Sequence, residues 1–332
     1  MKKCFLLLLC CLLILQGSLL PTFAEEVMPI DEEAGEAPLV GATEGSLELP
    51  CKSAVLMEAN TGTVLYTQNA DEALPPASVT KIMTLLLVME AVDSGALRLD
   101  DQISVSENAA SMGGSQVYLK EGEIMSVEDL LKSVVIASAN DAAVALAEYV
   151  AGSVPAFVDK MNARAKRLGM KNTVFENVTG LDDTAERHLT SAMDIALMSL
   201  ALISHKTILQ YSSIWMDTIR NGEFGLTNTN RLVRFYPGCT GLKTGSTSKA
   251  GFCVSVTAER DGMSLICVIM GAESRDVRNA TATRLLDWGF ANYGVYSADG
   301  LESTPMPVVG GSRDTCSCNK AIISRICRCF YF

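Results

Sequence analysis

Three short polar motifs in this 332-residue chain combine residue types and spacings that suit nucleophilic chemistry. The first is Ser78-Val-Thr-Lys81, which follows two prolines and opens a long apolar stretch. A serine at a helix start lies among unpaired backbone N–H groups at the positive end of the helix dipole, which suits a developing oxyanion. Lys81 falls one helical turn later on the same face. A partly buried Lys81 that has lost its proton could therefore act as the base for Ser78.

The spacing of Ser78 and Lys81 is not specific by itself. Ser246–Lys249 and Ser317–Lys320 share it, and a serine at this place could equally cap a helix. On the motif alone the cap is the favoured interpretation. Only Ser78, however, opens a long apolar stretch after a proline pair.

The second motif, Ser138-Ala-Asn140, lies 60 residues after Ser78 and interrupts an apolar run, which taken alone is typical of a loop. The third, Lys243-Thr-Gly245-Ser246, begins 105 residues after Ser138 and just before strand-like sequence. Lys243 and Thr244 could bind a carboxylate, and Gly245 would let a substrate backbone approach closely. The alternative for this motif is an ordinary polar strand start.

The ordered set of three motifs is more specific than any one of them. It resembles the active-site motifs of penicillin-binding proteins and serine β-lactamases. The sequences around Ser78, Ser138 and Lys243 are similar to those of the low-molecular-mass penicillin-binding proteins that are serine-type D-alanyl-D-alanine carboxypeptidases. The resemblance covers about Leu49 to Tyr296.

The resemblance implies a role for each residue of the first two motifs. Ser78 would be the acylated nucleophile and Lys81 its general base. Ser138 would relay a proton, and Asn140 would hydrogen-bond the substrate or Lys81.

In the third motif, the resemblance implies that Lys243 and Thr244 hold the terminal carboxylate beside Gly245. The backbone N–H groups of Ser78 and Ser246 would form the oxyanion hole. The implied reaction removes the terminal D-Ala from the pentapeptide stem of peptidoglycan through an acyl-enzyme. Penicillin and other β-lactams would acylate Ser78. No metal or organic cofactor is implied.

Three other functions are weighed against this one. A class A-like β-lactamase usually has Asp where Ala139 stands, and no Glu-x-x-x-Asn element occurs around Glu176. A Ser-His-Asp hydrolase would have to use His188 or His205, no Gly-x-Ser-x-Gly occurs, and a structural role is favoured for His188. A non-catalytic cell-wall-binding protein of the same fold is disfavoured because all three motifs are intact.

The sequence between the motifs predicts the elements that must position them. Strand patterns occur early, at 54–57 and 63–66, and late, at 252–257 and 263–270. Helical patterns lie between and after them, at 79–91, 126–135, 142–150, 155–168, 191–203 and 278–291. Strands at both ends with helices between them predict an α+β fold. With the resemblance, the expectation is a β-lactamase/transpeptidase-like fold: an antiparallel sheet flanked by helices, an all-helical lobe, and an active site in the cleft between them.

Residues 1–24 have the pattern of a signal peptide, with Lys2 and Lys3, an apolar run at Phe5–Leu15 and a Thr22-Phe-Ala24 cleavage site. A permanent membrane anchor is disfavoured because the apolar run is short. The mature protein is therefore predicted to be secreted and extracytoplasmic, at the cell wall or the outer face of the membrane. Residues 25–48 form an acidic leader, and the catalytic domain is predicted at 49–296.

Residues 297–332 are predicted to be a truncated or abnormal remnant of a C-terminal domain. Two Cys-x-Cys pairs occur there, Cys316/Cys318 and Cys327/Cys329, but their spacing is tight for zinc. A basic amphipathic pattern, with Ile322, Ile326 and Phe330 on one face, gives the alternative of peripheral membrane contact.

Composition excludes several other classes. The net charge of −11 argues against a nucleic-acid partner, which needs clustered basic residues. Only two histidines occur, which argues against a His-rich metal site. Cys253 and Cys267 lie in predicted strands and are expected to be buried free thiols, whereas oxidation of Cys239 could disturb the nearby Lys243.

Overall fold

The computed structural model describes residues 47–181 and 185–296, together with the backbone of short strand segments at 306–307, 315–316 and 325–328. The predicted signal peptide, nearly all of the acidic leader and most of the predicted remnant lie outside the described residues. The side chains of the two Cys-x-Cys pairs lie outside them as well.

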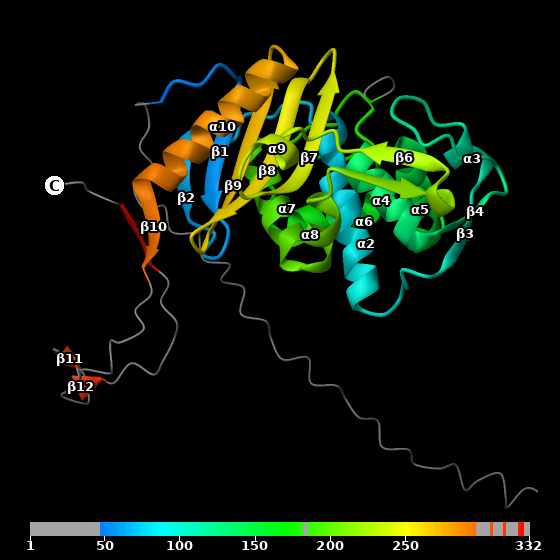
Figure 1. Cartoon of the computed structure of the whole chain (residues 1–332), viewed down its shortest axis with the longest axis horizontal. Coiled ribbons are helices and arrows are strands. Elements are labelled where there is room, and N and C mark those ends of the chain that lie inside the picture. The colour runs from blue at the N-terminus through cyan, green and yellow to red at the C-terminus, as the bar shows by residue number, and fades with distance from the viewer. Residues whose placement is uncertain (1–46, 182–184, 297–305, 308–314, 317–324, 329–332) are drawn as a thin grey trace, which may run out of the picture. The chain divides into compact units, whose positions relative to one another are not determined.

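A five-stranded antiparallel sheet organises the described fold (Figure 1). Its strand order is β2-β1-β9-β8-β7, which leaves β7 at one edge. The early hairpin thus joins the late strands, and Ser53 lies opposite Met270. The strands are β1 (Ser53–Glu58), β2 (Val64–Gln68), β7 (Cys239–Thr247), β8 (Gly251–Arg260) and β9 (Met263–Ala272).

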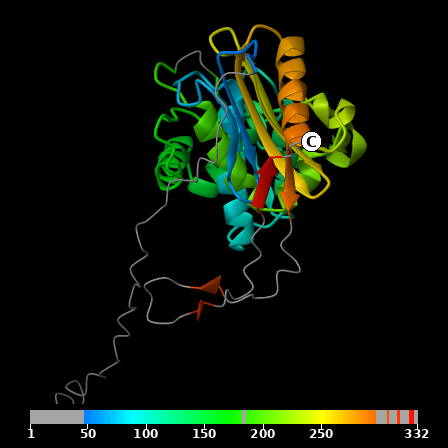
Figure 2. The same ribbon diagram turned by 90° about the vertical axis from the view of Figure 1, so that its left-hand side faces the viewer.

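Helices cover both faces of this sheet (Figures 1 and 2). Helix α10 (Arg275–Asn292) packs on one face and α7 (Ala192–Ser204) on the other. Alternate β9 side chains enter the two cores, with Leu265 in the same core as Leu285 of α10 and Ile266 in the core on the α7 side. Burial on both faces explains why β9 is a nearly continuous apolar run.

The helical lobe lies beside the β7 edge of the sheet (Figure 1). Its main helices are α2 (Lys81–Asp93), α4 (Val127–Ala137), α5 (Asn140–Ala151) and α6 (Val154–Arg167). Ser126 begins α4 as predicted, since its side chain accepts a hydrogen bond from the Asp129 N–H at 3.1 Å. The α2 helix is buried along most of its length between neighbouring helices, which holds its first residue firmly in place.

Short elements complete the described fold. Two small two-stranded sheets pair β3 (Gln102–Ser104) with β4 (Ile124–Ser126) and β5 (Met216–Ile219) with β6 (Phe224–Thr227). The other short elements are η1 (Ala77–Thr80), α3 (Glu107–Ala110), α8 (Thr207–Ser212), η2 (Arg220–Gly222), α9 (Leu232–Phe235), β10 (Tyr293–Tyr296), β11 (Met306–Pro307), β12 (Thr315–Cys316) and β13 (Arg325–Arg328).

The predicted α+β fold is confirmed, and the predicted helices and strands are found within a few residues of their expected bounds. The prediction for the third motif needs correction, because Lys243 lies inside a nine-residue strand rather than before the strands begin. Cys253 and Cys267 are confirmed as buried free thiols. Within the described residues no single helix is long and apolar enough to cross a membrane. One pair bent by 83°, α5 with α6, meets the length and composition criteria when its two helices are taken together.

Candidate active site

The turn that carries Ser78 is held in an unusual backbone conformation. Residues 77–80 form the 3-10 turn η1, and α2 follows from Lys81. Ala77 has a φ of +50°, in the left-handed region that side chains disfavour. The cap interpretation of Ser78 is wrong: Pro76 and Thr80 occupy the cap positions of η1 and α2, and neither receives a side-chain capping bond. The Ser78 hydroxyl is therefore not used to hold a helix end.

Lys81 is buried directly behind Ser78 and has three hydrogen-bond partners. Its Nζ lies 3.0 Å from Ser78 Oγ, 2.6 Å from Asn140 Oδ1 and 2.8 Å from the Thr179 carbonyl. Burial lowers the pKa of Lys81 well below its usual value, and the nearby Lys243 lowers it further while Asp141 acts in the opposite sense. The low pKa favours the neutral amine.

The partners of Lys81 direct its lone pair. The Thr179 carbonyl can only accept, and Asn140 presents its Oδ1 because its Nδ2 donates to the Gly113 carbonyl at 2.7 Å. A neutral amine has two hydrogens, and these two acceptors take both of them. The lone pair is left facing the Ser78 hydroxyl, which is the geometry required of a general base.

Ser138 lies at the break between two helices, where the second motif was expected to interrupt the apolar run. It ends α4 in the left-handed conformation, and α5 begins at Asn140. Lys243 Nζ donates to Ser138 Oγ at 2.8 Å. Burial lowers the pKa of Lys243 to about 7, with a further contribution from Arg278. The second and third motifs are thus joined by a hydrogen bond across 105 positions.

The third motif lies on the edge strand β7, which packs against the η1 turn that carries Ser78, here called the nucleophile turn. A Cβ on Gly245 would lie 2.7 Å from the Ser78 backbone nitrogen, so only glycine allows β7 to pack this closely. Thr244 is held by a 2.8 Å hydrogen bond between its hydroxyl and that of Thr229. Ser246 follows as an exposed residue of the same edge strand. The outer backbone groups of an edge strand are open to an extended ligand.

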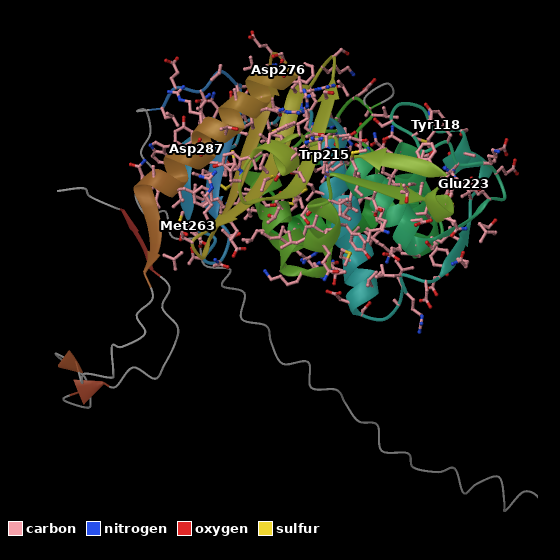
Figure 3. The ribbon with its side chains drawn as sticks, in the orientation of Figure 1. Tyr118, Trp215, Glu223, Met263, Asp276 and Asp287 are labelled. Carbon is pink, nitrogen blue, oxygen red and sulfur yellow. The ribbon has the colours of Figure 1, made fainter. Side chains whose placement is uncertain are left out.

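Arg278 lies near the site, although its sequence context predicts only the start of a helix. It lies in the first turn of α10, two residues after Asp276, which Figure 3 labels. Its side chain is 3% exposed, and no ion-pair partner is found for it among residues 47–181 and 185–296. A buried cation beside Lys243 favours an anionic ligand here. No local sequence pattern singles this arginine out.

The two histidines do not form a relay with Ser78. His188 Nε2 lies 2.7 Å from Thr80 Oγ1, and His205 Nδ1 lies 2.5 Å from a carboxylate oxygen of Asp93 near the other end of α2. The part of the chain that the structure describes also has no cluster of three His, Cys, Asp or Glu side chains that could hold a metal ion.

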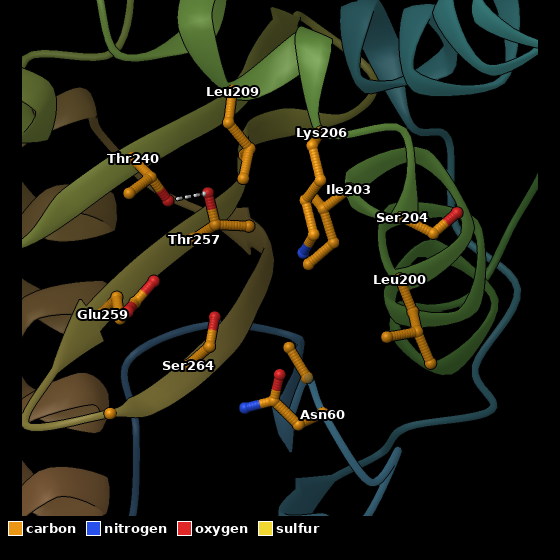
Figure 4. Close-up of a pocket in the computed structure, with 12 residues that line it drawn as sticks. Asn60, Leu200, Ile203, Ser204, Lys206, Leu209, Thr240, Thr257, Glu259 and Ser264 are labelled. Atoms are coloured by element: carbon orange, nitrogen blue, oxygen red, sulfur yellow. Dashed lines mark hydrogen bonds between the residues drawn. The ribbon is translucent and has the colours of Figure 1, made fainter. Parts of the chain in front are cut away.

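A hollow of about 490 Å³ lies away from these residues (Figure 4). It is lined by both apolar and polar side chains, including Leu200, Lys206 and Glu259. At its wall, Thr240 donates a 2.8 Å hydrogen bond to Thr257. No residue of the three motifs lines it, so it is separate from the Ser78 site.

Comparison with known proteins shows the family to which the chain is similar. The sequence profile of a family described as D-alanyl-D-alanine carboxypeptidase matches residues 40–274. The chain is 48% identical over 256 residues to D-alanyl-D-alanine carboxypeptidase DacF of Bacillus subtilis, covering 76% of this chain and 65% of that protein. It is 39% identical over 264 residues to DacC of Escherichia coli, with the same coverage of each chain. The chain thus spans slightly less than two thirds of the length of these relatives.

Solved structures of penicillin-binding proteins are also similar to this chain. Penicillin-binding protein D2 of Listeria monocytogenes in its ampicillin-bound form is 34% identical, with a TM-score of 0.68 over 74% of this chain and 100% of that one. Penicillin-binding protein 6B of Escherichia coli is 36% identical, with a TM-score of 0.73 over 79% of this chain and 84% of that one.

Proposed function

The chain belongs to the D-alanyl-D-alanine carboxypeptidase family of serine peptidases, and from that premise we propose that it removes the terminal D-Ala from peptidoglycan stem peptides. The observation that carries the proposal is the position of Lys81 Nζ, which lies 3.0 Å from Ser78 Oγ and is bonded to two further acceptors. In the neutral amine these two acceptors take both hydrogens, and the lone pair faces Ser78. Membership of the family supplies the substrate class. The edge of β7 supplies a place for an extended peptide.

In the acylation step, Ser78 Oγ attacks the carbonyl carbon of the penultimate D-Ala while its proton passes to Lys81 Nζ. The backbone N–H groups of Ser78 and Ser246 stabilise the oxyanion of the tetrahedral intermediate. The peptide C–N bond then breaks. Its nitrogen takes a proton that Lys81 returns through Ser138, and D-Ala leaves with a free amine.

In the deacylation step, water attacks the ester on Ser78 and gives a proton to Lys81. The ester bond breaks, Lys81 passes its extra proton to Ser78 Oγ, and the shortened peptide leaves as a carboxylic acid that releases its proton to water and becomes a carboxylate. Lys243 and Thr244 hold the terminal carboxylate of the incoming substrate, with Arg278 as a further cation. Because two of these groups are cations, we expect a substrate with a free C-terminal carboxylate to be favoured.

The test is the intact mass of residues 25–332 during incubation with benzylpenicillin, beside a Ser78→Ala variant of the same length. The proposal expects a long-lived adduct of one penicillin on the unmodified protein and none on the variant. The release of D-Ala from a synthetic peptide ending in D-Ala-D-Ala should be lost in parallel. An adduct that forms at the same rate on the Ser78→Ala variant would show that another group is the nucleophile.

The same sample tests the alternatives. Penicillin that is consumed without a lasting adduct would indicate a β-lactamase. Penicillin that is left intact by a folded protein would indicate a non-catalytic wall-binding protein. The family membership and the β-lactam-bound relatives favour the carboxypeptidase.

The location of the protein and its domain bounds are further parts of the proposal. We infer that residues 1–24 direct export and are removed, that 49–296 form the catalytic domain, and that the enzyme acts outside the cytoplasm where peptidoglycan lies. The mass of the mature protein from cells would show cleavage after Ala24 directly. The peripheral membrane contact predicted for the C-terminus is tested by vesicle sedimentation of residues 25–332.

A further inference from the structure

His188 lies directly behind the turn that carries Ser78, and both of its ring nitrogens are engaged. Its Nδ1 accepts a hydrogen bond from the Glu176 backbone N–H at 3.0 Å. Its Nε2 lies 2.7 Å from Thr80 Oγ1. Because an Nδ1 that accepts carries no proton, the proton of the neutral ring lies on Nε2 and is donated to Thr80.

Thr80 links His188 to the backbone next to Ser78 by a second hydrogen bond. Its hydroxyl, fully buried, donates to the Ala77 carbonyl at 2.8 Å. Ala77 is the residue with the left-handed backbone, so its conformation must be held by the surrounding contacts. The backbone of Gly180 packs against the same carbonyl, where a Cβ would approach to 1.8 Å.

The segment behind the turn also supplies a partner of Lys81. Asn177 Oδ1 accepts hydrogen bonds from the N–H groups of Thr179 and Gly180 at 3.1 and 2.7 Å. This fixes the Thr179 carbonyl, which accepts from Lys81 Nζ at 2.8 Å. His188, through Glu176, is therefore bonded to the segment that orients Lys81 and, through Thr80, to the turn that carries Ser78.

We propose that His188 is a positioning residue of the reaction, which sets the separation of Ser78 and Lys81 by locking the nucleophile turn to the 176–180 segment. The proposal rests on the proposed acylation of Ser78. It assigns the effect to one bond, from His188 Nε2–H to Thr80 Oγ1. The other bond, from Glu176 N–H to Nδ1, holds the ring in place and contributes mainly to stability.

Two amide replacements separate these bonds, because glutamine places an N–H group near the position of Nε2 and asparagine places an acceptor near that of Nδ1. His188→Gln keeps a donor for Thr80 but leaves the Glu176 N–H without its acceptor. His188→Asn keeps that acceptor but leaves Thr80 without its donor. Thr80→Val removes the bond from the other side, and Thr80→Ser is its matched control.

The experiment measures acylation of residues 25–332 by benzylpenicillin over a range of concentrations, which separates the dissociation constant from the maximal acylation rate. We expect His188→Asn and Thr80→Val to lower the maximal rate by about 10-fold to 100-fold, since small misplacement of reacting groups has effects of this size, with the dissociation constant little changed. His188→Gln and Thr80→Ser should stay within about threefold of the unmodified protein. His188→Gln should nevertheless unfold at a lower temperature because the Glu176 N–H loses its acceptor in the protein.

The assignment to the Thr80 bond would be overturned if His188→Asn and His188→Gln had equal maximal acylation rates, whether both were slowed or both were unchanged. Where a histidine variant fails to fold, the Thr80→Val and Thr80→Ser pair decides the question by the same comparison. Failure of the unmodified protein to form an adduct would instead refute the proposed function, so the two failures are distinguishable.

Discussion

Replacing Gly245 by alanine tests how tightly the edge strand must pack on the nucleophile turn. The added Cβ would lie 2.7 Å from the Ser78 nitrogen, 2.8 Å from the Val79 nitrogen and 2.9 Å from the Pro76 carbonyl oxygen. Ordinary contacts begin at 3.4 Å, so the turn and β7 must separate by about 0.7 Å. All three atoms belong to the backbone and cannot rotate away.

A displacement approaching 1 Å costs about 100-fold in rate, which is ~2.7 kcal/mol of activation free energy. Overpacking of this kind also lowers the free energy of unfolding by about 1–3 kcal/mol. We therefore expect Gly245→Ala to fold, to melt several degrees lower and to acylate about 100-fold more slowly.

The assay is the rate of benzylpenicillin adduct formation by intact mass, with thermal unfolding followed in parallel. Gly225→Ala on β6 is the matched control, because a Cβ there meets nothing within 4 Å and the backbone does not have a positive φ. The control should acylate at the unmodified rate. Acylation of Gly245→Ala at that same rate would refute the argument that contact between β7 and the turn positions Ser78.

Three further predictions concern charge and packing. Lys243→Met removes a buried amine with a pKa of about 7 in the folded protein, against about 10.4 in the unfolded chain. Between these two pKa values the unfolded chain binds more protons than the folded protein, so this lysine makes the free energy of unfolding rise by up to ~1.4 kcal/mol per pH unit. Urea titrations between about pH 7.5 and 9.5 should therefore show a shallower rise of that free energy in Lys243→Met than in the unmodified protein. Lys243 holds the substrate carboxylate only when protonated, so we expect D-Ala release to fall as the pH rises through the pKa of Lys243, which is about 7. Arg278→Gln should raise that pKa and move this alkaline limb to higher pH, and an unmoved limb in the pH–rate profile would contradict this role of Arg278. Leu286→Ala in the core between the sheet and α10 should cost about 2–5 kcal/mol in chemical denaturation while leaving the acylation rate close to that of the unmodified protein.

Much of the fold could be predicted because its signals are local. Ser126 begins a helix with two acidic residues in the first turn, and the apolar period of α4 follows from there. The strands β8 and β9 are apolar runs separated by a turn at Gly262. Such patterns depend on a dozen neighbouring residues and need no knowledge of distant contacts.

The parts that could not be predicted depend on distant contacts. The polar residues of β7 give no strand pattern, because Lys243 and Thr244 point to partners in the helical lobe and the 229 region rather than to an apolar core. Arg278 looks like any arginine in the first turns of a helix. The contact of Gly180 with Ala77 joins positions 103 apart, and nothing near either residue marks it.

The strand order of the sheet has a consequence for how the chain folds as it is made. The hairpin of β1 and β2 emerges first, yet β1 has its second neighbour only in β9, with Ser53 opposite Met270. More than two hundred residues must therefore be synthesised before this central pairing can form. Until then, two buried strands have an unsatisfied edge and apolar faces without their covering helices. Closure of the sheet is a late, long-range event that should make folding slow, and any nascent chain that stops before β9 keeps its first strands exposed to aggregation.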